Sequence, residues 1–279
     1  MIENQQIGEA NNHSIVVAEL NSTDRAILAS AYESLEHPSL ASRLGNMIGS
    51  PIEIGFHILP RQWYRRLHEL TERTIFATLS AAISTLDKKP ASQPRSGYHK
   101  TLSFATGGVS GFFGLPALLI ELPITTTLML RSIADIAQSY GEDLKQIETR
   151  IACLQVFALS GRTHEDDATE SGYYGMRLAL SISMFNAQDR IMKHGLAQSP
   201  VMIRMISFIA QRFGVQVQQK TAAKMVPIVG ALSSAAINVI FMQHFQQIAH
   251  AHFAIRNLER KYGKSLVQAE YEKLTTNDN

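Results

Sequence analysis

Residues 101–130 read TLSFATGGVSGFFGLPALLIELPITTTLML, and no other part of the chain stays this apolar for as long. The stretch contains a single charge, Glu121, and is flanked by Lys100 and Arg131. Residues that interrupt a regular helix are spread through it: Gly107, Gly108, Gly111, Gly114, Pro116 and Pro123. Glycine and proline at this density divide a helix into shorter pieces. The stretch therefore predicts a Gly/Pro-broken hydrophobic helical hairpin.

A simple transmembrane helix is a poor interpretation of this stretch. A spanning helix needs about 20 apolar residues to cross a hydrocarbon core of about 30 Å, and the apolar run 104–120 is slightly shorter. Pro116 and Pro123 each remove a backbone donor. Glu121 at the middle of a bilayer would cost about 3 kcal/mol unless it were paired or protonated.

Two interpretations of the hairpin stay open. In the first, the glycines allow close helix packing inside a bundle, and Glu121 is a buried carboxylate with an arginine partner. In the second, the hairpin enters one leaflet of a membrane, with Lys100 and Arg131 at the headgroups. The apolar side chains that would then contact lipid are Phe112, Phe113, Leu115, Leu118 and Leu119.

Composition and charge narrow the classes of function. Charged residues make up 18% of the 279 residues, below the quarter or so that is usual for soluble proteins. The net charge is +2, and no basic run is interleaved with aromatic residues, so we expect no nucleic-acid partner. The N-terminal residues do not resemble a signal peptide, which predicts a cytoplasmic location. The single cysteine, Cys153, excludes an internal disulfide and is expected to be a small buried side chain.

The clearest internal boundary is the connector 87–98, DKKPASQPRSGY, which is rich in Pro, Ser and Lys. Before it, we predict a disordered polar tail over 1–21 and N-terminal helices over 22–86. After it, we predict a hydrophobic helical core over 99–265 and a polar C-terminal tail over 266–279.

Helical patterns dominate the whole chain. The first helix is expected to begin at an N-cap among Ser22, Thr23 and Asp24 and to stop before His37. Gly141 is predicted to end the helix that follows the organising stretch, as a left-handed C′ residue. No segment alternates as a strand would, so the prediction is an all-α, multi-helix bundle.

Four sequence segments stand out along the chain: GSPIEIGFHILP, ATGGVSGFFGLPALLIELP with the following RSIADIAQSYGEDL, TRIACLQVFALSG, and KMVPIVGALSSAAINVIF. Together they cover roughly 40–260 and resemble the EcsC protein family. The resemblance implies a bacterial helical protein that is cytoplasmic or membrane-associated. Glu121 matches the acidic residue that follows the family's Gly/Pro segment. Ile136, Ala137, Tyr140 and Gly141 match its IA-x-x-YG signature, and the resemblance transfers no catalytic residue.

The best candidate site is formed by Glu121, Arg131 and Asp135. Arg131 and Asp135 are i,i+4 partners on a helix, and a kink at Pro123 would fold Glu121 towards Arg131. A carboxylate placed there would serve as a general base or as a sensor of lipid headgroups. A purely structural ion pair is the alternative.

Metal binding is weakly supported. His244, His250 and His252 lie near one another in sequence, but 244 and 252 are about 12 Å apart along a helix, and 250 and 252 point about 200° apart. An acidic loop contains the weak candidate ligands His164, Asp166 and Asp167, whose spacing matches neither an EF-hand nor a zincin pattern. The sequence predicts no cofactor.

Two functions follow from these observations. The first is a non-enzymatic accessory or regulatory protein that binds lipid or a membrane-protein partner, located in the cytoplasm and peripheral to or partly inserted in the inner membrane. The alternative is a hydrolase that acts on lipid or peptide at the membrane surface through buried carboxylates, with or without a metal. Strips of small residues in the predicted helices also fit a homo-oligomer.

Overall fold

The computed structural model describes residues 19–37, 40–48, 65–66, 69–70, 73–74, 115–160, 172–178, 200–225 and 231–278. Its helices are α1 (Ser22–Glu36), α2 (Leu40–Ile48), α6 (Leu115–Ser139), α7 (Ile147–Leu159), α10 (Pro200–Met225), α11 (Ala231–Tyr262) and α12 (Lys264–Asp278). Residues 173–178 form a further short helix. The described residues contain no strand, which confirms the all-α prediction.

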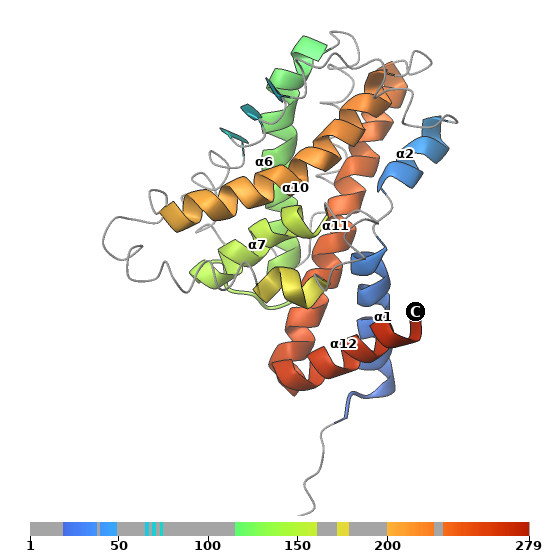
Figure 1. Ribbon diagram of the computed structural model, residues 1–279, viewed down its shortest axis with the longest axis vertical. Helices are drawn as coiled ribbons and strands as arrows, with labels where there is room; N and C mark the ends of the chain where they lie inside the picture. The colour runs from blue at the N-terminus through green and yellow to red at the C-terminus, as the bar shows by residue number, and fades with distance from the viewer. Residues whose placement is uncertain are drawn as a thin grey trace, which may run out of the picture.

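Helix α11 is the centre of the arrangement. It is 32 residues long and contacts α1, α2, α6, α7, α10 and α12. Figure 1 shows α6, α7 and α10 on one side of it and α1 and α2 on the other, with α12 folded back below. Buried residues occur on several faces of α11, as expected for a helix surrounded by others: Ile237, Phe241, Phe245, Ile248, Phe253, Ile255 and Leu258.

Aromatic side chains fill the space where α7, α10 and α11 meet. Phe157, Phe213, Phe241 and Phe245 are fully buried, and their ring centroids lie 5.0–6.2 Å apart in five pairs. All five pairs are edge-on or tilted, and aromatic quadrupoles disfavour face-to-face stacking. Packing of this kind fixes the mutual positions of the three helices.

Helix α6 contains the second half of the stretch around which the fold was predicted. It runs without interruption from Leu115 through Pro123 to Ser139, a length of 25 residues. Pro116 lies in the first turn, where a missing N–H is tolerated. Residues 101–114, with the four glycines, lie outside the described residues, so the hairpin itself stays a prediction.

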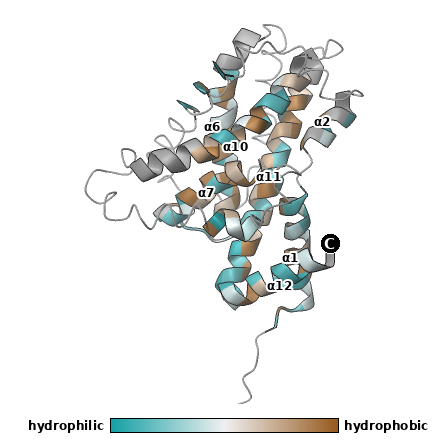
Figure 2. Ribbon diagram, in the orientation of Figure 1, coloured by the Kyte–Doolittle hydropathy of each residue, from teal (hydrophilic) through white to brown (hydrophobic). Residues whose placement is uncertain are grey.

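None of the described helices combines the length and the apolar character that a bilayer-crossing helix requires. Figure 2 shows why for α11, along which hydrophilic residues recur among the hydrophobic ones.

Gly141 ends α6 as predicted. Its φ is +80°, a conformation that glycine adopts without strain. The N–H of Gly141 donates to the carbonyl of Gln138 at 2.9 Å, and the N–H of Glu142 donates to that of Ala137 at 3.1 Å. These two bonds form a Schellman motif, which turns the chain towards α7.

The start of α1 differs slightly from the prediction. The N-cap is Asn21, one residue before the three candidates, because its side-chain oxygen accepts the N–H of Asp24 at 2.7 Å. The helix ends at Glu36, before His37, as expected.

Helix α12 occupies the segment predicted as a polar C-terminal tail. Gly263, with a φ of +89°, separates it from α11. Val267 and Tyr271 recur one turn apart and are 0% and 3% exposed, so the segment has a narrow buried face against α1 and α11. Leu266 and Leu274 of the same helix are partly buried against the core, and only two fully buried apolar positions were too few to signal the helix in the sequence.

Candidate functional site

Glu121 of α6 lies in a buried ion pair with Lys220 of α10. The Nζ of Lys220 donates to Oε1 of Glu121 at 2.6 Å, and the two side chains are 2% and 3% exposed. The ring of Phe241 covers the ammonium, with Nζ 4.7 Å from its centroid, a favourable cation–π geometry. The pair therefore joins α6 to α10 beside the aromatic core.

Arg131 and Asp135 are not brought to Glu121. Arg131 lies ten residues further along the continuous helix, about 15 Å along its axis. Its side chain is exposed and that of Asp135 is half-buried. The ion partner of Glu121 in the structure is a lysine of another helix, where the sequence analysis expected an arginine.

The chemistry open to Glu121 follows from this pairing. An ammonium 2.6 Å from Oε1 stabilises the ionised carboxylate and occupies an oxygen that a general base would need. The arrangement therefore favours a structural role for Glu121, in which its ion pair with Lys220 holds α6 against α10. Sequence reasoning missed Lys220 because it lies 99 residues away in an ordinary helical pattern.

Most of the other predicted site residues lie outside the residues that the structure describes. Phe112, Phe113, His164, Asp166 and Asp167 belong to undescribed segments, and Leu115, Leu118 and Leu119 lie in the first turns of α6 with their side chains undescribed. In the described part of the chain no three His, Cys, Asp or Glu residues cluster as metal ligands would.

The three histidines of α11 each meet a different partner. His244 faces the carbonyl of Ser160 at 3.5 Å, His250 faces the hydroxyl of Tyr140 at 3.4 Å, and Nδ1 of His252 lies 3.0 Å from the hydroxyl of Tyr173. Burial lowers the pKa of His244 to about 4. Burial also lowers the pKa of His252 well below its ordinary value, so both rings are neutral at pH 7.

Glu142 is a second buried carboxylate and holds the α6–α7 turn against α11. Arg256 donates to both of its oxygens, at 2.8 and 3.0 Å, Arg260 donates to Oε1, and Thr149 donates at 3.0 Å. Burial raises the pKa of Glu142, but the hydrogen bonds and charges of these partners outweigh it and hold the pKa below its ordinary value. The backbone carbonyl of Tyr140 also accepts from Arg260. Tyr140, in the IA-x-x-YG signature, is therefore bonded to α11 through its backbone carbonyl.

A third charged cluster joins the short helix 173–178 to α11. Arg177 donates to both carboxylate oxygens of Glu259, at 2.7 and 2.9 Å, and to the hydroxyl of Tyr173 at 3.2 Å. The Tyr173 hydroxyl, which accepts from Arg177, also lies 3.0 Å from Nδ1 of His252.

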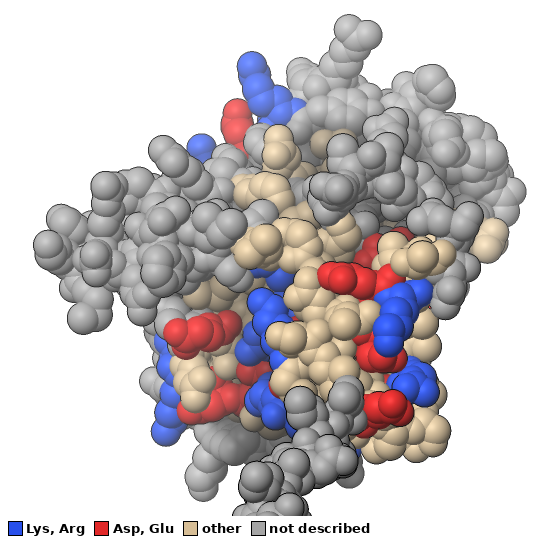
Figure 3. Space-filling model, turned by 60° about the horizontal axis from the view of Figure 1, so that its bottom comes forward, with Lys and Arg blue, Asp and Glu red and all other residues tan. Residues whose placement is uncertain are grey.

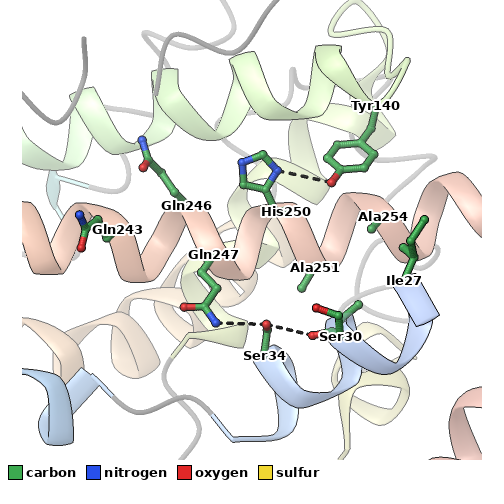
Figure 4. A pocket seen from close by; sticks show the side chains of 11 residues that line it. Ile27, Ser30, Ser34, Tyr140, Gln243, Gln246, Gln247, His250, Ala251 and Ala254 are labelled. Atoms are coloured by element: carbon green, nitrogen blue, oxygen red, sulfur yellow. Dashed lines mark hydrogen bonds between the residues drawn. The ribbon is translucent and has the colours of Figure 1, made fainter. Parts of the chain in front are cut away.

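A pocket of about 560 Å³ lies between α1, α11 and the end of α6. Its lining residues are Ile27, Ser30, Ala31, Ser34, Tyr140, Gln243, Gln246, Gln247, His250, Ala251 and Ala254. Figure 4 shows Gln247 pointing to Ser34 and His250 to Tyr140 across the pocket. The described lining includes no Asp, Glu, Lys or Arg.

The described surface carries charges of both signs. Figure 3 shows Lys and Arg side chains intermixed with Asp and Glu around an uncharged central area of the lower face. Among the described residues, Lys261 and Asp24 form an ion pair at 2.6 Å.

Comparison with models of protein families gives a match over most of the chain. The sequence model of the family described as the EcsC protein family matches residues 33–258. No curated protein and no solved structure matches the chain.

Proposed function

The chain belongs to the EcsC protein family, and we propose that it is a non-enzymatic accessory protein that attaches to membrane lipid through residues 101–120. The proposal includes a bacterial host and a location at the cytoplasmic face of the inner membrane. Its partner is the lipid bilayer, and the attached part is the uncharged run that precedes the core of α6.

The observation that carries the proposal is the position of the Glu121–Lys220 pair. Residues 101–120 contain no Asp, Glu, Lys or Arg, and Glu121 is the first charge after Lys100. That charge is neutralised inside the protein, by Lys220 at 2.6 Å. The pair therefore marks where the run joins the protein core, and lipid attachment of the run needs no charge in the hydrocarbon.

The ion-paired carboxylates of the described core support binding over hydrolysis. Glu121, Glu142 and Glu259 are each held by a cation at hydrogen-bonding distance. A carboxylate held in this way is stabilised as an anion within a helix contact and is poorly placed to accept a proton from substrate. We therefore propose that these three carboxylates stabilise the fold and take no part in catalysis.

The test is flotation of purified protein with protein-free vesicles of anionic and zwitterionic phospholipid. The wild type is expected to float with the vesicles, and the double variant Leu118→Asp/Leu119→Asp to stay at the bottom of the gradient, because two carboxylates oppose transfer into lipid. Leu178→Asp is the matched control, since Leu178 is an aliphatic residue 57% exposed on another helix. Circular dichroism verifies that the variants stay folded.

Three results would contradict the proposal. Flotation of the double variant at the wild-type level would exclude residues 118 and 119 from the contact. Loss of flotation in Leu178→Asp would place the lipid contact on a surface outside residues 101–120. Recovery with cell membranes but not with protein-free vesicles would replace lipid with a membrane-protein partner.

A further inference from the structure

We propose that the pocket between α1, α11 and Tyr140 binds an uncharged, polyhydroxylated small molecule such as a sugar or a cyclitol. The pocket lies beside the end of α6 that Tyr140 follows, whereas residues 101–120 lead into the other end of this 25-residue helix, about 37 Å away. The inference is therefore independent of membrane attachment.

The two helices form the pocket with one face each. Ile27, Ser30, Ala31 and Ser34 follow the i, i+3, i+4, i+7 spacing of a single face of α1. The opposite wall is the face of α11 from Gln243 to Ala254, which is about 16 Å long. Alanine and serine dominate where the helices approach, and their small size leaves room for a ligand. The volume of about 560 Å³ is within the usual range for ligand pockets.

The chemistry of the lining selects an uncharged ligand that forms hydrogen bonds. Glutamine, serine, histidine and tyrosine provide seven of the eleven lining residues, and none of the described lining side chains is a carboxylate, an ammonium or a guanidinium. A charged ligand would lose hydration without meeting a counter-charge among the described lining side chains. An apolar ligand would displace water from the remaining N–H of Gln247 and the remaining lone pair of Ser34 without replacing that hydrogen bond, which costs free energy.

Existing hydrogen bonds orient the polar groups before a ligand arrives. Gln247 accepts from Arg43 through its carboxamide oxygen and donates to the Ser34 hydroxyl at 3.1 Å. Ser34 donates to the carbonyl of Ser30 at 3.0 Å. The second N–H of Gln247 and the remaining lone pair of Ser34 stay available. Because one group donates and the other accepts, a ligand hydroxyl, which does both, complements them.

Further polar groups extend this pattern along α11. Gln246 donates to the Ser132 hydroxyl at 2.7 Å, which fixes its carboxamide, while Gln243 is exposed at the rim. His250 and Tyr140 close the other side, with Nδ1 and the hydroxyl 3.4 Å apart. Donors and acceptors spaced along one wall suit a ligand that carries several hydroxyls on a ring.

The experiment is isothermal titration of the full-length protein with four probes. Methyl α-D-glucopyranoside and myo-inositol are neutral polyols, and glucose 6-phosphate and glucosamine are charged counterparts. We expect saturable binding of at least one neutral probe and weaker binding of both charged ones. Gln247→Leu keeps the size of the side chain and removes the carboxamide. It should lower the affinity for the neutral probe about fivefold, as expected for the loss of one neutral hydrogen bond.

Two further variants make the test decisive. Gln268→Leu is the matched control, because Gln268 lies on α12 outside the pocket and donates to Glu272. The Gln268→Leu variant should bind the neutral probe with the affinity of the wild type. Gln243→Leu replaces Gln247→Leu if the latter fails to fold, since Gln243 is exposed. The proposal is overturned if neither neutral probe binds, if the charged probes bind as tightly, or if the pocket variant and the control have equal affinity.

Discussion

Removing the ammonium of Lys220 should destabilise the protein strongly. In Lys220→Met the side chain keeps its length but loses its charge, and Glu121, 3% exposed, is left buried without its cation. Removal of one partner of a buried ion pair costs about 3–5 kcal/mol. Domains have unfolding free energies of about 5–15 kcal/mol, so this single change removes a large share of the stability.

The double variant Glu121→Leu/Lys220→Met separates an ion pair from simple packing. With both charges gone no carboxylate is left uncompensated, and an apolar replacement of a buried pair is neutral or stabilising by about 1–4 kcal/mol. We therefore expect the double variant to be at least as stable as the wild type and much more stable than Lys220→Met. The two single costs should be strongly non-additive.

Urea denaturation followed by circular dichroism measures these differences through the unfolding free energy extrapolated to water. A cost below about 1 kcal/mol for Lys220→Met, less than the usual penalty for an uncompensated buried charge, would refute the buried pair. A double variant whose loss equals the sum of the single losses would also refute it, because the two side chains would then act independently.

Four other predictions concern single positions. Gly141→Ala should lower the unfolding free energy by about 1–2 kcal/mol because the backbone at this position is left-handed. Gly214→Ala, within α10, should raise it by about 0.5–1 kcal/mol, because an added Cβ there meets no atom within 4 Å. The midpoints of urea denaturation compare the two variants. His244, whose pKa burial lowers to about 4, binds its proton more readily when unfolded, so stability should fall as the pH drops from about 6.5 to 4, and less so in His244→Gln. Glu142 has a pKa below its ordinary value, so the stability that its ionised form contributes should be complete above about pH 4.3 and lost as the pH falls below that value. The difference in unfolding free energy between the wild type and Glu142→Gln should therefore disappear at low pH. Cys153, whose pKa burial raises to about 12, should react with a thiol reagent only after denaturation.

Local patterns in the sequence predicted much of the helical fold. The apolar period identified α1, and His37 followed by Pro38 marked its end. Gly141 was recognisable as a C′ residue because a left-handed position after a helix selects glycine. Cys153 was expected to be buried and is 1% exposed. These features depend on neighbours within a few residues, which the sequence displays directly.

Contacts between distant segments were not predictable in the same way. Lys220 and Glu121 meet across 99 residues, and nothing in the pattern around Lys220 distinguishes it from a surface lysine. The pocket arises from the crossing of α1 and α11, whose Ser34 and Gln247 lie 213 residues apart. Helix α12 was missed because only Val267 and Tyr271 bury fully in a polar segment.

The most direct measurement of lipid attachment uses a fluorophore placed on the proposed contact. Cys153 is the sole cysteine and is buried, so a Cys153→Ala background carrying Leu118→Cys can be labelled at one site with an environment-sensitive dye. On addition of protein-free vesicles, we predict a blue shift of the emission and quenching by a lipid-linked quencher. The same dye at Leu178→Cys should not respond. An unchanged spectrum at 118, or an equal response at 178, would contradict the attachment of residues 101–120 to lipid.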